Sequence, residues 1–546
     1  MRLLRHGSQC RWRLVRSLRD ERAMDYLIAG AGSAGAVLAA RLSEDRRNRV
    51  TLVEAGGRDR SPLVAMPAGC FKLMGNPAAD WNYLTEADPS IGNRQVIWSG
   101  GKMLGGSSSI NGLVYIRGQR QDYRRWVEAG ATGWDWDDLL PYFKRSECFT
   151  GAPSQAHGMH GPMKVGPANA RHSLADAMIE TCVRLGYPHL IDYCDGDQFG
   201  VYENYTTAGG GTRQSTSRTF LREAKNRSNL RVVTKAMVDK VLVKDNKAIG
   251  LAIEQHGQRK TLYADEVIIS AGTIGSPAIL LRSGLGPALH LRDLGIDVIA
   301  DLPVGLNLQE HSGYTASKLV NIPTYNSPFG PLVIGRALLQ WIFTRSGPLS
   351  SAAVQVMGMI KSSPDEVEPD VGLNFLPLAM DFSLGKPEMH HAPGITVGAT
   401  CVRPESRGEI RLRSRDPAVP PVIDHRLLGS EDDLARLIAA GKFLEKLFAT
   451  DPLARHIIGN NFPAKTPRND AEWEETVRML TSHGYHPVGT CRMGGSDAVL
   501  DPQLRVRGVE RLRVIDASVM PRLISGNTNA ATIAIAEKGA DLIKAA

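Results

Sequence analysis

The chain has 546 residues, of which 42% are hydrophobic and 22% charged, and these globular proportions exclude a disordered protein. The net charge is +8, but the first 23 residues contribute +5 of it through seven arginines and two acids, so the body gives no support to a nucleic-acid-binding function. The seven cysteines form no C-x-x-C pair, which argues against a disulfide framework and favours a reducing compartment.

The arginine-rich residues 1–23 lack the 7–15-residue apolar stretch of a secretory signal. We predict that they form a disordered basic extension, with a working start at Met24 or a functional basic tail as alternatives. The chain has no uninterrupted apolar run of 18 residues, so no transmembrane helix is predicted. A cytoplasmic protein is therefore expected, with peripheral membrane association as the alternative.

The folded part begins with an apolar run at 25–29, a glycine motif, helix formers and a second apolar run at 49–53. This order predicts the start of a parallel, doubly wound sheet. The motif G-x-G-x-x-G allows a tight turn, the approach of a pyrophosphate and close packing of the helix; its glycines are Gly30, Gly32 and Gly35. Glu54, at the end of the second strand, is placed to accept ribose hydroxyls, so a dinucleotide site is expected, FAD and NAD not being separated. A glycine-rich turn without a ligand is the alternative.

Further along the chain, the spacing of apolar residues predicts the remaining elements. We expect helices near 119–129 and 136–146, strands between 229 and 269, a strand at 409–414, a helix-rich stretch at 430–480, a strand at 512–515 and a closing helix at 530–544. Residues 311–400 are irregular, and apart from one apolar stretch no elements are assigned there. Within them, the apolar stretch 331–343 is predicted to be a core or interdomain helix, with contact to a membrane surface as the alternative.

Four more motifs contain residue types suited to binding or catalysis. They are GKMLGGSSSING (101–112), SAGTIGSP (270–277), YHPVGTCRMG (485–494) and the paired segments DAS and GNTNAAT (516–518 and 526–532). His486 has the side chain best suited to proton transfer near neutral pH. Taken singly, the glycine–serine segment could be an ordinary loop, His486 a structural residue and Asn529 a helix cap, and these alternatives stay open.

Together, in this order, the motifs resemble those of the glucose–methanol–choline (GMC) flavoprotein oxidoreductases, over roughly residues 24–546. The similar subgroup is that of bacterial FAD-dependent alcohol dehydrogenases and choline dehydrogenases. The resemblance implies an α/β fold in which a Rossmann-type FAD-binding domain is interleaved with a substrate-binding domain built on an antiparallel sheet with helices. The implied boundaries are 24–165, 215–315 and 484–546 for the FAD-binding domain, and 166–214 and 316–483 for the substrate-binding domain.

The resemblance also implies the residues that hold FAD. They are Gly30, Gly32, Ser33, Ala34, Gly35, Glu54, Ala55, Lys102, Leu104, Gly105, Gly106, Ser107, Asn111, Gly112, Val238, Ala271, Asp516, Ala517, Asn527 and Thr528. Some relatives attach flavin through a histidine just before the loop asparagine; here Ile110 stands at that position, so FAD is expected to be non-covalent. No metal site is predicted.

By the same resemblance, His486 is the general base and Asn529 the hydrogen-bond donor to the alkoxide, with hydride passing to flavin N5. The expected reaction is oxidation of an alcohol, primary in our favoured interpretation, to an aldehyde. Phe375 is a candidate substrate contact beside His486 and Asn529, with core packing as its alternative.

Alternative functions remain open at this stage, and one of them is a flavin-binding structural or regulatory protein, against which the presence of both His486 and Asn529 argues. An oxidase would pass electrons to O₂ and make H₂O₂, for which the small Gly484 is a weak indication. A non-redox hydroxynitrile lyase is another, because such lyases share the fold. The expected partners are a small alcohol and an electron acceptor, either a quinone, another carrier or O₂. Homodimer formation is left open.

Overall fold

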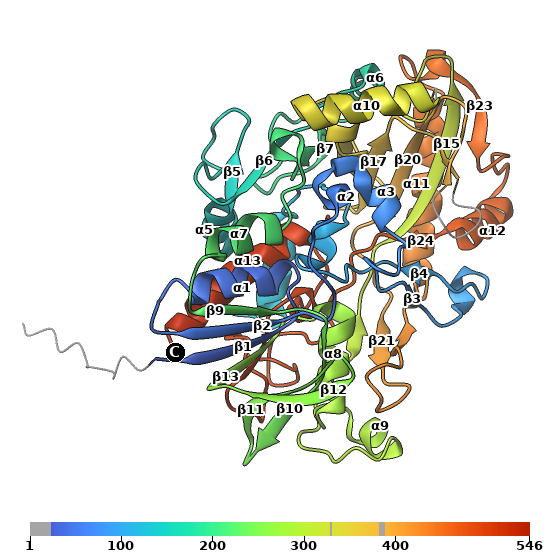
Figure 1. The fold of residues 1–546 in the computed structure, drawn as a ribbon. Coiled ribbons are helices and arrows are strands. Elements are labelled where there is room, and N and C mark those ends of the chain that lie inside the picture. The colour runs from blue at the N-terminus through green and yellow to red at the C-terminus, as the bar shows by residue number, and fades with distance from the viewer. Residues whose placement is uncertain (1–22, 328–329, 382–387) are drawn as a thin grey trace, which may run out of the picture.

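The computed structural model describes residues 23–327, 330–381 and 388–546. The predicted extension at 1–23 therefore lies almost wholly outside the described residues. Two sheets organise the molecule (Figure 1). The first is a five-stranded sheet in the order β25-β13-β1-β2-β9, with strands β1 (Asp25–Ala29), β2 (Arg49–Val53), β9 (Leu230–Val233), β13 (Glu266–Ile269) and β25 (Leu512–Val514). All four of its strand pairings are parallel.

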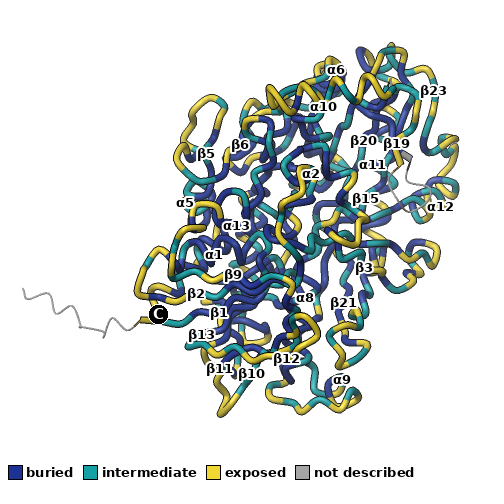
Figure 2. Tube along the Cα trace, viewed as in Figure 1, coloured by how far each residue is buried: buried dark blue, intermediate teal, exposed yellow. Residues whose placement is uncertain are grey.

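Helices α1 (Ser33–Leu42) and α13 (Asn529–Lys544) pack on one another along one face of this sheet. The other face is covered by the antiparallel strands β10 (Ala236–Lys244), β11 (Lys247–Gln255) and β12 (Gln258–Tyr263), and α8 (Gly272–Arg282) follows β13. The tube in Figure 2 shows how completely β1 and α1 are buried. The predicted α/β fold with a parallel sheet is confirmed.

The second sheet is antiparallel and has six strands, in the order β16-β17-β20-β15-β23 with β24 beside β15. Its strands are β15 (Ser312–Val320), β16 (Val356–Ile360), β17 (Val371–Leu376), β20 (Gly394–Cys401), β23 (Ile457–Phe462) and β24 (Ser482–His483). Helices α11 (Glu431–Phe448) and α12 (Asp470–Leu480) pack against it. The edge strand β16 is buried along its whole length and the central strand β20 along most of it, so these two lack the regular alternation by which a half-exposed strand is recognised in a sequence.

Several predicted helices and strands are confirmed with small shifts at their ends. They include α4 (Arg120–Glu128), α5 (Trp136–Ser146), β21 (Gly408–Arg411) and α13. Smaller elements lie between them, among them α6 (Ser173–Arg184), α9 (Ala288–Asp293), β14 (Leu306–Leu308) and β22 (Val422–Asp424). The two sheets agree in kind with the two expected domains, whose boundaries stay a prediction.

The apolar stretch at 331–343 does form a helix, α10 (Pro331–Thr344), but the prediction that it lies in the core is wrong. Trp341 is the buried residue of α10, and its indole N–H donates to the carbonyl of Gly211 at 2.9 Å. The other large apolar side chains of the helix are exposed. The hydrophobicity of this stretch therefore does not predict whether its side chains are buried. Among the described residues, no helix is both long enough and apolar enough to cross a bilayer.

Candidate active site

A cavity of about 1100 Å³ is lined by residues from both sheets. At one end are the glycine turn after β1 and Glu54 at the end of β2. At the other end Asn374, Leu376 and Thr400 come from the six-stranded sheet, and His486 with two asparagines also lines the cavity. The cavity therefore joins the predicted dinucleotide site to the predicted catalytic residues.

The turn between β1 and α1 depends on glycine at two positions. Gly30 has φ of +100°, and a Cβ there would lie 2.3 Å from the carbonyl oxygen of Ser270. At Gly35 a Cβ would lie 1.9 Å from the carbonyl oxygen of Gly30, so any side chain would push α1 away from the strand. Both observations match the roles that the spacing predicts.

Glu54 closes the turn from the second strand. Its carboxylate accepts hydrogen bonds from the backbone N–H groups of Ala31 and Gly56, each at 2.8 Å. Burial raises the pKa of Glu54 to about 7, while these two donors and Lys102 act in the opposite direction. The Glu54 side chain is thus fixed beside the turn, where it forms part of the cavity wall.

The glycine–serine segment packs directly on the first turn. The N–H of Gly105 donates to the carbonyl of Ala31 at 2.7 Å, and a Cβ on Gly106 would lie 2.7 Å from the Cα of Gly32. Here two stretches of backbone meet without side chains between them, which leaves the cavity open beside them.

Asp516 connects the carboxyl-terminal segment to the turn after β13. Its carboxylate accepts from the N–H of Gly272 at 2.9 Å and from that of Ser518 at 2.8 Å.

Arg213 binds the glycine–serine segment 101–112 and is not among the residues that the sequence analysis singles out. Its buried guanidinium donates to the side-chain oxygen and to the carbonyl of Asn111, both at 2.7 Å. Burial lowers the pKa of Arg213 to about 10. It lies in a glycine-rich stretch, GGGTRQST, that carries no recognisable binding motif, so nothing in the sequence pointed to it.

His486 lies in the loop after β24 and is held by two residues that precede β15. The N–H of His486 donates to both carboxylate oxygens of Glu310, at 2.8 and 2.9 Å. Glu310 also accepts from the N–H of His311 at 2.8 Å, and burial raises the pKa of Glu310 to about 8. Neither Glu310 nor His311 belongs to a motif that the sequence analysis singles out.

The hydrogen bonds of His311 determine which nitrogen of His486 carries a proton. His311 Nε2 lies 3.1 Å from the carbonyl oxygen of Ile524, which can only accept, so Nε2 is the protonated nitrogen. Burial lowers the pKa of His311 to about 4, and the ring is therefore neutral with a lone pair on Nδ1. His486 Nδ1 lies 3.0 Å from that Nδ1 and must donate to it. Nε2 of His486 is consequently the acceptor.

The asparagine nearest to His486 is Asn527, whose Nδ2 lies 2.7 Å from His486 Nε2. This residue was assigned to the cofactor in the sequence analysis. Asn529, the expected partner of His486, lines the same cavity as the first residue of α13, with Thr528 at the N-cap. Its Oδ1 accepts from the hydroxyl of Ser33 at 2.7 Å. The amide NH₂ of Asn529 then remains as a donor.

Most of the predicted site residues line the cavity. Those that do are Gly30, Gly32, Ser33, Ala34, Glu54, Ala55, Lys102, Gly106, Ser107, Asn111, Gly112, Val238, Ala271, His486, Asp516, Ala517, Asn527, Thr528 and Asn529. Gly35, Leu104 and Gly105 lie behind this wall and shape it.

Phe375 requires a correction. It is fully buried in the hydrophobic core of the six-stranded sheet. Asn374 and Leu376, its neighbours in β17, line the cavity. Because successive side chains of a strand point to opposite faces, Phe375 points away from the cavity. The alternative of core packing holds for this residue.

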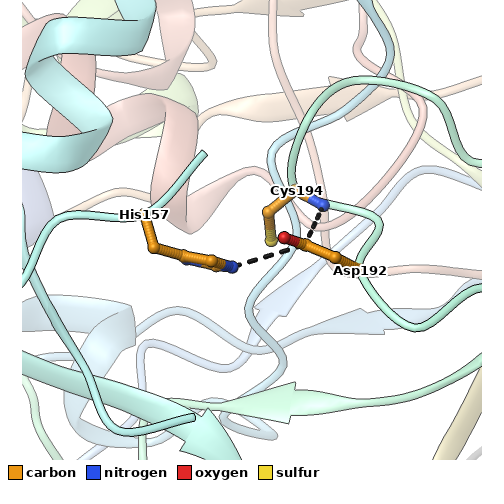
Figure 3. A group of neighbouring side chains, drawn as sticks. All are labelled: His157, Asp192 and Cys194. Carbon is orange, nitrogen blue, oxygen red and sulfur yellow. Dashed lines mark hydrogen bonds and ion pairs between the residues drawn. The ribbon is translucent and has the colours of Figure 1, made fainter. Parts of the chain in front are cut away.

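A second polar cluster lies outside the cavity and contains His157, Asp192 and Cys194 (Figure 3). Glu147 adjoins it beside His157. His157 Nδ1 lies 3.0 Å from Glu147 and Nε2 lies 3.3 Å from Asp192. Asp192 also accepts from the N–H of Cys194, and Arg117 forms an ion pair with Glu147 at 2.6 Å. Both imidazole nitrogens thus face carboxylates, an arrangement that favours a protonated histidine, while the positive charge of Arg117 acts against it.

Comparison with known proteins agrees with this geometry. Two models of the GMC oxidoreductases match residues 24–313 and 404–536. An alcohol dehydrogenase [acceptor] of Pseudomonas putida is 38% identical over 530 residues, which cover 95% of each chain. An oxygen-dependent choline dehydrogenase of Rhizobium johnstonii is 36% identical, also over 95% of each chain. The pyridoxine 4-oxidase of Mesorbium loti is a solved structure that is 30% identical, with a TM-score of 0.87 over 96% of this chain and 99% of its own.

The fold is that of the FAD-binding oxidoreductases, and His486 lines its cavity. The chain belongs to the GMC oxidoreductase family, as the resemblance in the sequence predicts. Members of this family are FAD-binding flavoproteins, and this chain is an oxidoreductase of that kind.

Proposed function

We propose that this protein oxidises an alcohol to an aldehyde with non-covalently bound FAD and passes the electrons to an acceptor other than a nicotinamide. The observation that carries the proposal is the acceptor tautomer of His486, whose Nε2 carries a lone pair that accepts from the Asn527 amide in the absence of substrate. Removal of a hydride from a carbinol carbon needs a base for the hydroxyl proton, and a positioned base contributes about 100- to 10,000-fold in rate.

The residues present fit an FAD molecule. Gly32 and Gly106 bring two backbones together where side chains would fill the cavity, and Glu54 stands at the ribose-binding position of such turns. Bound FAD would supply the hydride acceptor for the reaction. Ile110 lines the cavity and has no nucleophilic atom, which supports non-covalent attachment.

The chain's own residues would divide the work at the hydroxyl group. His486 Nε2 would take the hydroxyl proton once a substrate displaces the amide of Asn527. The NH₂ of Asn529 would donate to the developing alkoxide oxygen, a contribution of about 3 to 4 kcal/mol at the upper end. His311 and Glu310 would hold the imidazole in place from behind. Asn374, Leu376 and Thr400 would form part of the pocket for the rest of the alcohol.

The names of the relatives support an alcohol as substrate, because two are dehydrogenases of an alcohol and of choline. The similar solved structure, pyridoxine 4-oxidase, is that of an oxidase, so O₂ is the acceptor of the second candidate function. Gly484 does not help to decide between an oxidase and a dehydrogenase. A Cβ at this position would lie 2.9 Å from His486 Nδ1, so the space beside the glycine is already taken by the imidazole.

The test is a stopped-flow absorbance experiment under argon with aliphatic, benzylic, allylic and amino alcohols. Bleaching of the flavin by any of them, lost in His486→Ala with flavin still bound, supports the proposal. Unchanged bleaching in His486→Ala would remove the role of His486. Readmission of air separates the two candidates, because rapid recovery of colour with peroxide indicates an oxidase and slow recovery a dehydrogenase. Bound flavin that no alcohol bleaches would favour the non-redox lyase.

A further inference from the structure

Helix α10 exposes an unusually large set of apolar side chains. Leu332 is 89% exposed and Phe343 80%, and Val333, Ile334, Leu338, Leu339 and Ile342 are between 36% and 57% exposed. In Figure 2 the tube of α10, at the top of the molecule, is coloured mainly as exposed. Contiguous apolar surface of this kind marks an interaction site rather than ordinary surface.

The helix is attached to the protein along a narrow line. The buried Trp341 anchors it through the bond to Gly211, and the guanidinium of Arg345, the C-cap of the same helix, lies over the Trp341 ring at 4.3 Å from its centroid. Gly335 and Ala337 are only partly buried. The helix therefore stands out from the body with one edge fixed and the rest of its circumference turned outward.

The apolar side chains occupy about half of that circumference. At 100° per residue, Ile334, Leu338 and Ile342 form one row, and Leu332, Leu339 and Phe343 form the next. Arg336, also exposed, lies beyond the second row. An apolar face that carries leucine and phenylalanine beside arginine is typical of helices that lie in the interface of a membrane.

The charges around α10 point to an anionic partner. No aspartate or glutamate occurs from residue 312 to residue 364, whereas Arg336 and Arg345 are both exposed. A second copy packed on this face about a two-fold axis would bring the same acid-free stretch against these arginines, so no acid from it could pair with them. A surface of anionic phospholipid would satisfy the arginines and the apolar rows together.

We propose that α10 docks this protein on the surface of a lipid bilayer that contains anionic phospholipid. The apolar rows would enter the boundary between headgroups and acyl chains, parallel to the surface, while Arg336 contacts lipid phosphate. The proposal concerns binding alone and does not rest on the proposed function.

The test is flotation of the full-length, flavin-loaded protein with vesicles of phosphatidylcholine alone or mixed with phosphatidylglycerol. The variant is the triple substitution Leu332→Glu, Leu339→Glu and Phe343→Glu, at positions that are at least 57% exposed. We expect the wild type to bind the mixed vesicles more tightly than the neutral ones, and the triple variant to lose at least tenfold in binding to them. Flavin absorbance and the unfolding midpoint check that the fold is intact.

The matched control is Ile191→Glu, Leu289→Glu and Val367→Glu, which adds the same charge at apolar residues that are 80%, 76% and 88% exposed elsewhere. Residues 1–22 are present in all three proteins, so any binding by that basic segment is common to them. Equal loss of binding in the control would overturn the role of α10, as would a wild type that binds neither vesicle. A wild-type dimer that the α10 substitutions convert to a monomer, with vesicle binding unchanged, would assign the face to a second copy instead.

Discussion

The Nδ1 atoms of His311 and His486 lie 3.0 Å apart, and the rings meet nearly at right angles, with an interplanar angle of 79°. Two such nitrogens can share only one proton, and the carbonyl of Ile524 fixes the proton of His311 on its other nitrogen. His311 thereby sets the tautomer of His486 without lining the cavity itself. It acts as a positioning residue for the proposed base.

We predict that His311→Leu lowers kcat by about fivefold to tenfold, the value of one ordinary hydrogen bond of about 1 to 1.4 kcal/mol. The loss arises because His486 Nδ1 no longer has its acceptor and the ring can adopt the other tautomer. His311→Gln, whose amide oxygen can accept the same bond, should retain more activity. Steady-state kinetics at equal flavin content measures both, and equal activity of the leucine variant and the wild type would refute the positioning role.

The two asparagines should respond differently to substitution by alanine. Asn527 donates to the unprotonated form of His486, so Asn527→Ala removes a bond that favours the neutral ring and raises the pKa of His486. The base acts when unprotonated, so the pH below which kcat/KM declines should move upward in this variant. Asn529→Ala should instead lower kcat by about 100- to 1000-fold with no such displacement. The pH profiles of kcat/KM distinguish the two, and an identical shift in both variants would contradict this division.

In the wild type, the decline of kcat/KM on the acid side of the pH profile should occur at low pH. Burial lowers the pKa of His486 well below its ordinary value, and the neighbouring His311 and His483 lower it further. A base with a depressed pKa stays unprotonated as the pH falls below 6.5. Wild-type kcat/KM should therefore hold its plateau through pH 6.5 in assays at constant ionic strength, and a decline that begins above that value would count against the assignment.

Gly484→Ala should impair catalysis without unfolding the protein. A Cβ at this position would lie 2.9 Å from His486 Nδ1 and 3.0 Å from the Cβ of His311, so the imidazole must move. We expect a loss of at least tenfold in kcat, because small displacements of a catalytic group are costly. Gly459→Ala is the control, since a Cβ there has no atom within 4 Å. Comparable kcat values for the two variants would show that His486 tolerates displacement.

The His157 cluster should stabilise the protein mainly at low pH. Its carboxylates, those of Glu147 and Asp192, raise the pKa of His157 against the opposing effect of burial, and the pKa of Asp192 is lowered to about 2. A raised folded-state pKa gives stability that is fully present below the unfolded value near 6.5 and is lost as the pH rises through the folded value. Thermal unfolding of His157→Gln should thus show a larger decrease in midpoint at about pH 5.5 than at about pH 9. An equal decrease in the unfolding midpoint at both pH values would mean that the charge on His157 contributes nothing to stability.

The sequence predicted the parts of the site that consist of local backbone chemistry. The turn at Gly30 and the acid at Glu54 follow from a strand, a turn and a strand that are adjacent in the chain, and the structure places them as expected. Residues whose role depends on distant contacts were missed. His311 and His486 are 175 positions apart, and Arg213 is 102 positions from Asn111, so no short pattern could join them.

Burial was the other quantity that the sequence could not supply. Phe375 and Leu376 are adjacent and both apolar, yet one lies in the core and the other lines the cavity. Which face of β17 meets the cavity depends on the register of its partners β16 and β20. In α10 the difference is reversed, because the apolar stretch is mostly exposed although its composition predicts burial.

The hydrogen bond from Ser33 to Asn529 has a consequence for the synthesis of this protein. It joins residues 496 positions apart, and the strand β25 that completes the parallel sheet is likewise among the last to be made. A ribosome must release almost the whole chain before the first glycine turn meets its partner helix. Nascent chains that stop short of Asp516 therefore lack the part of the cavity wall that this last segment and the start of α13 supply.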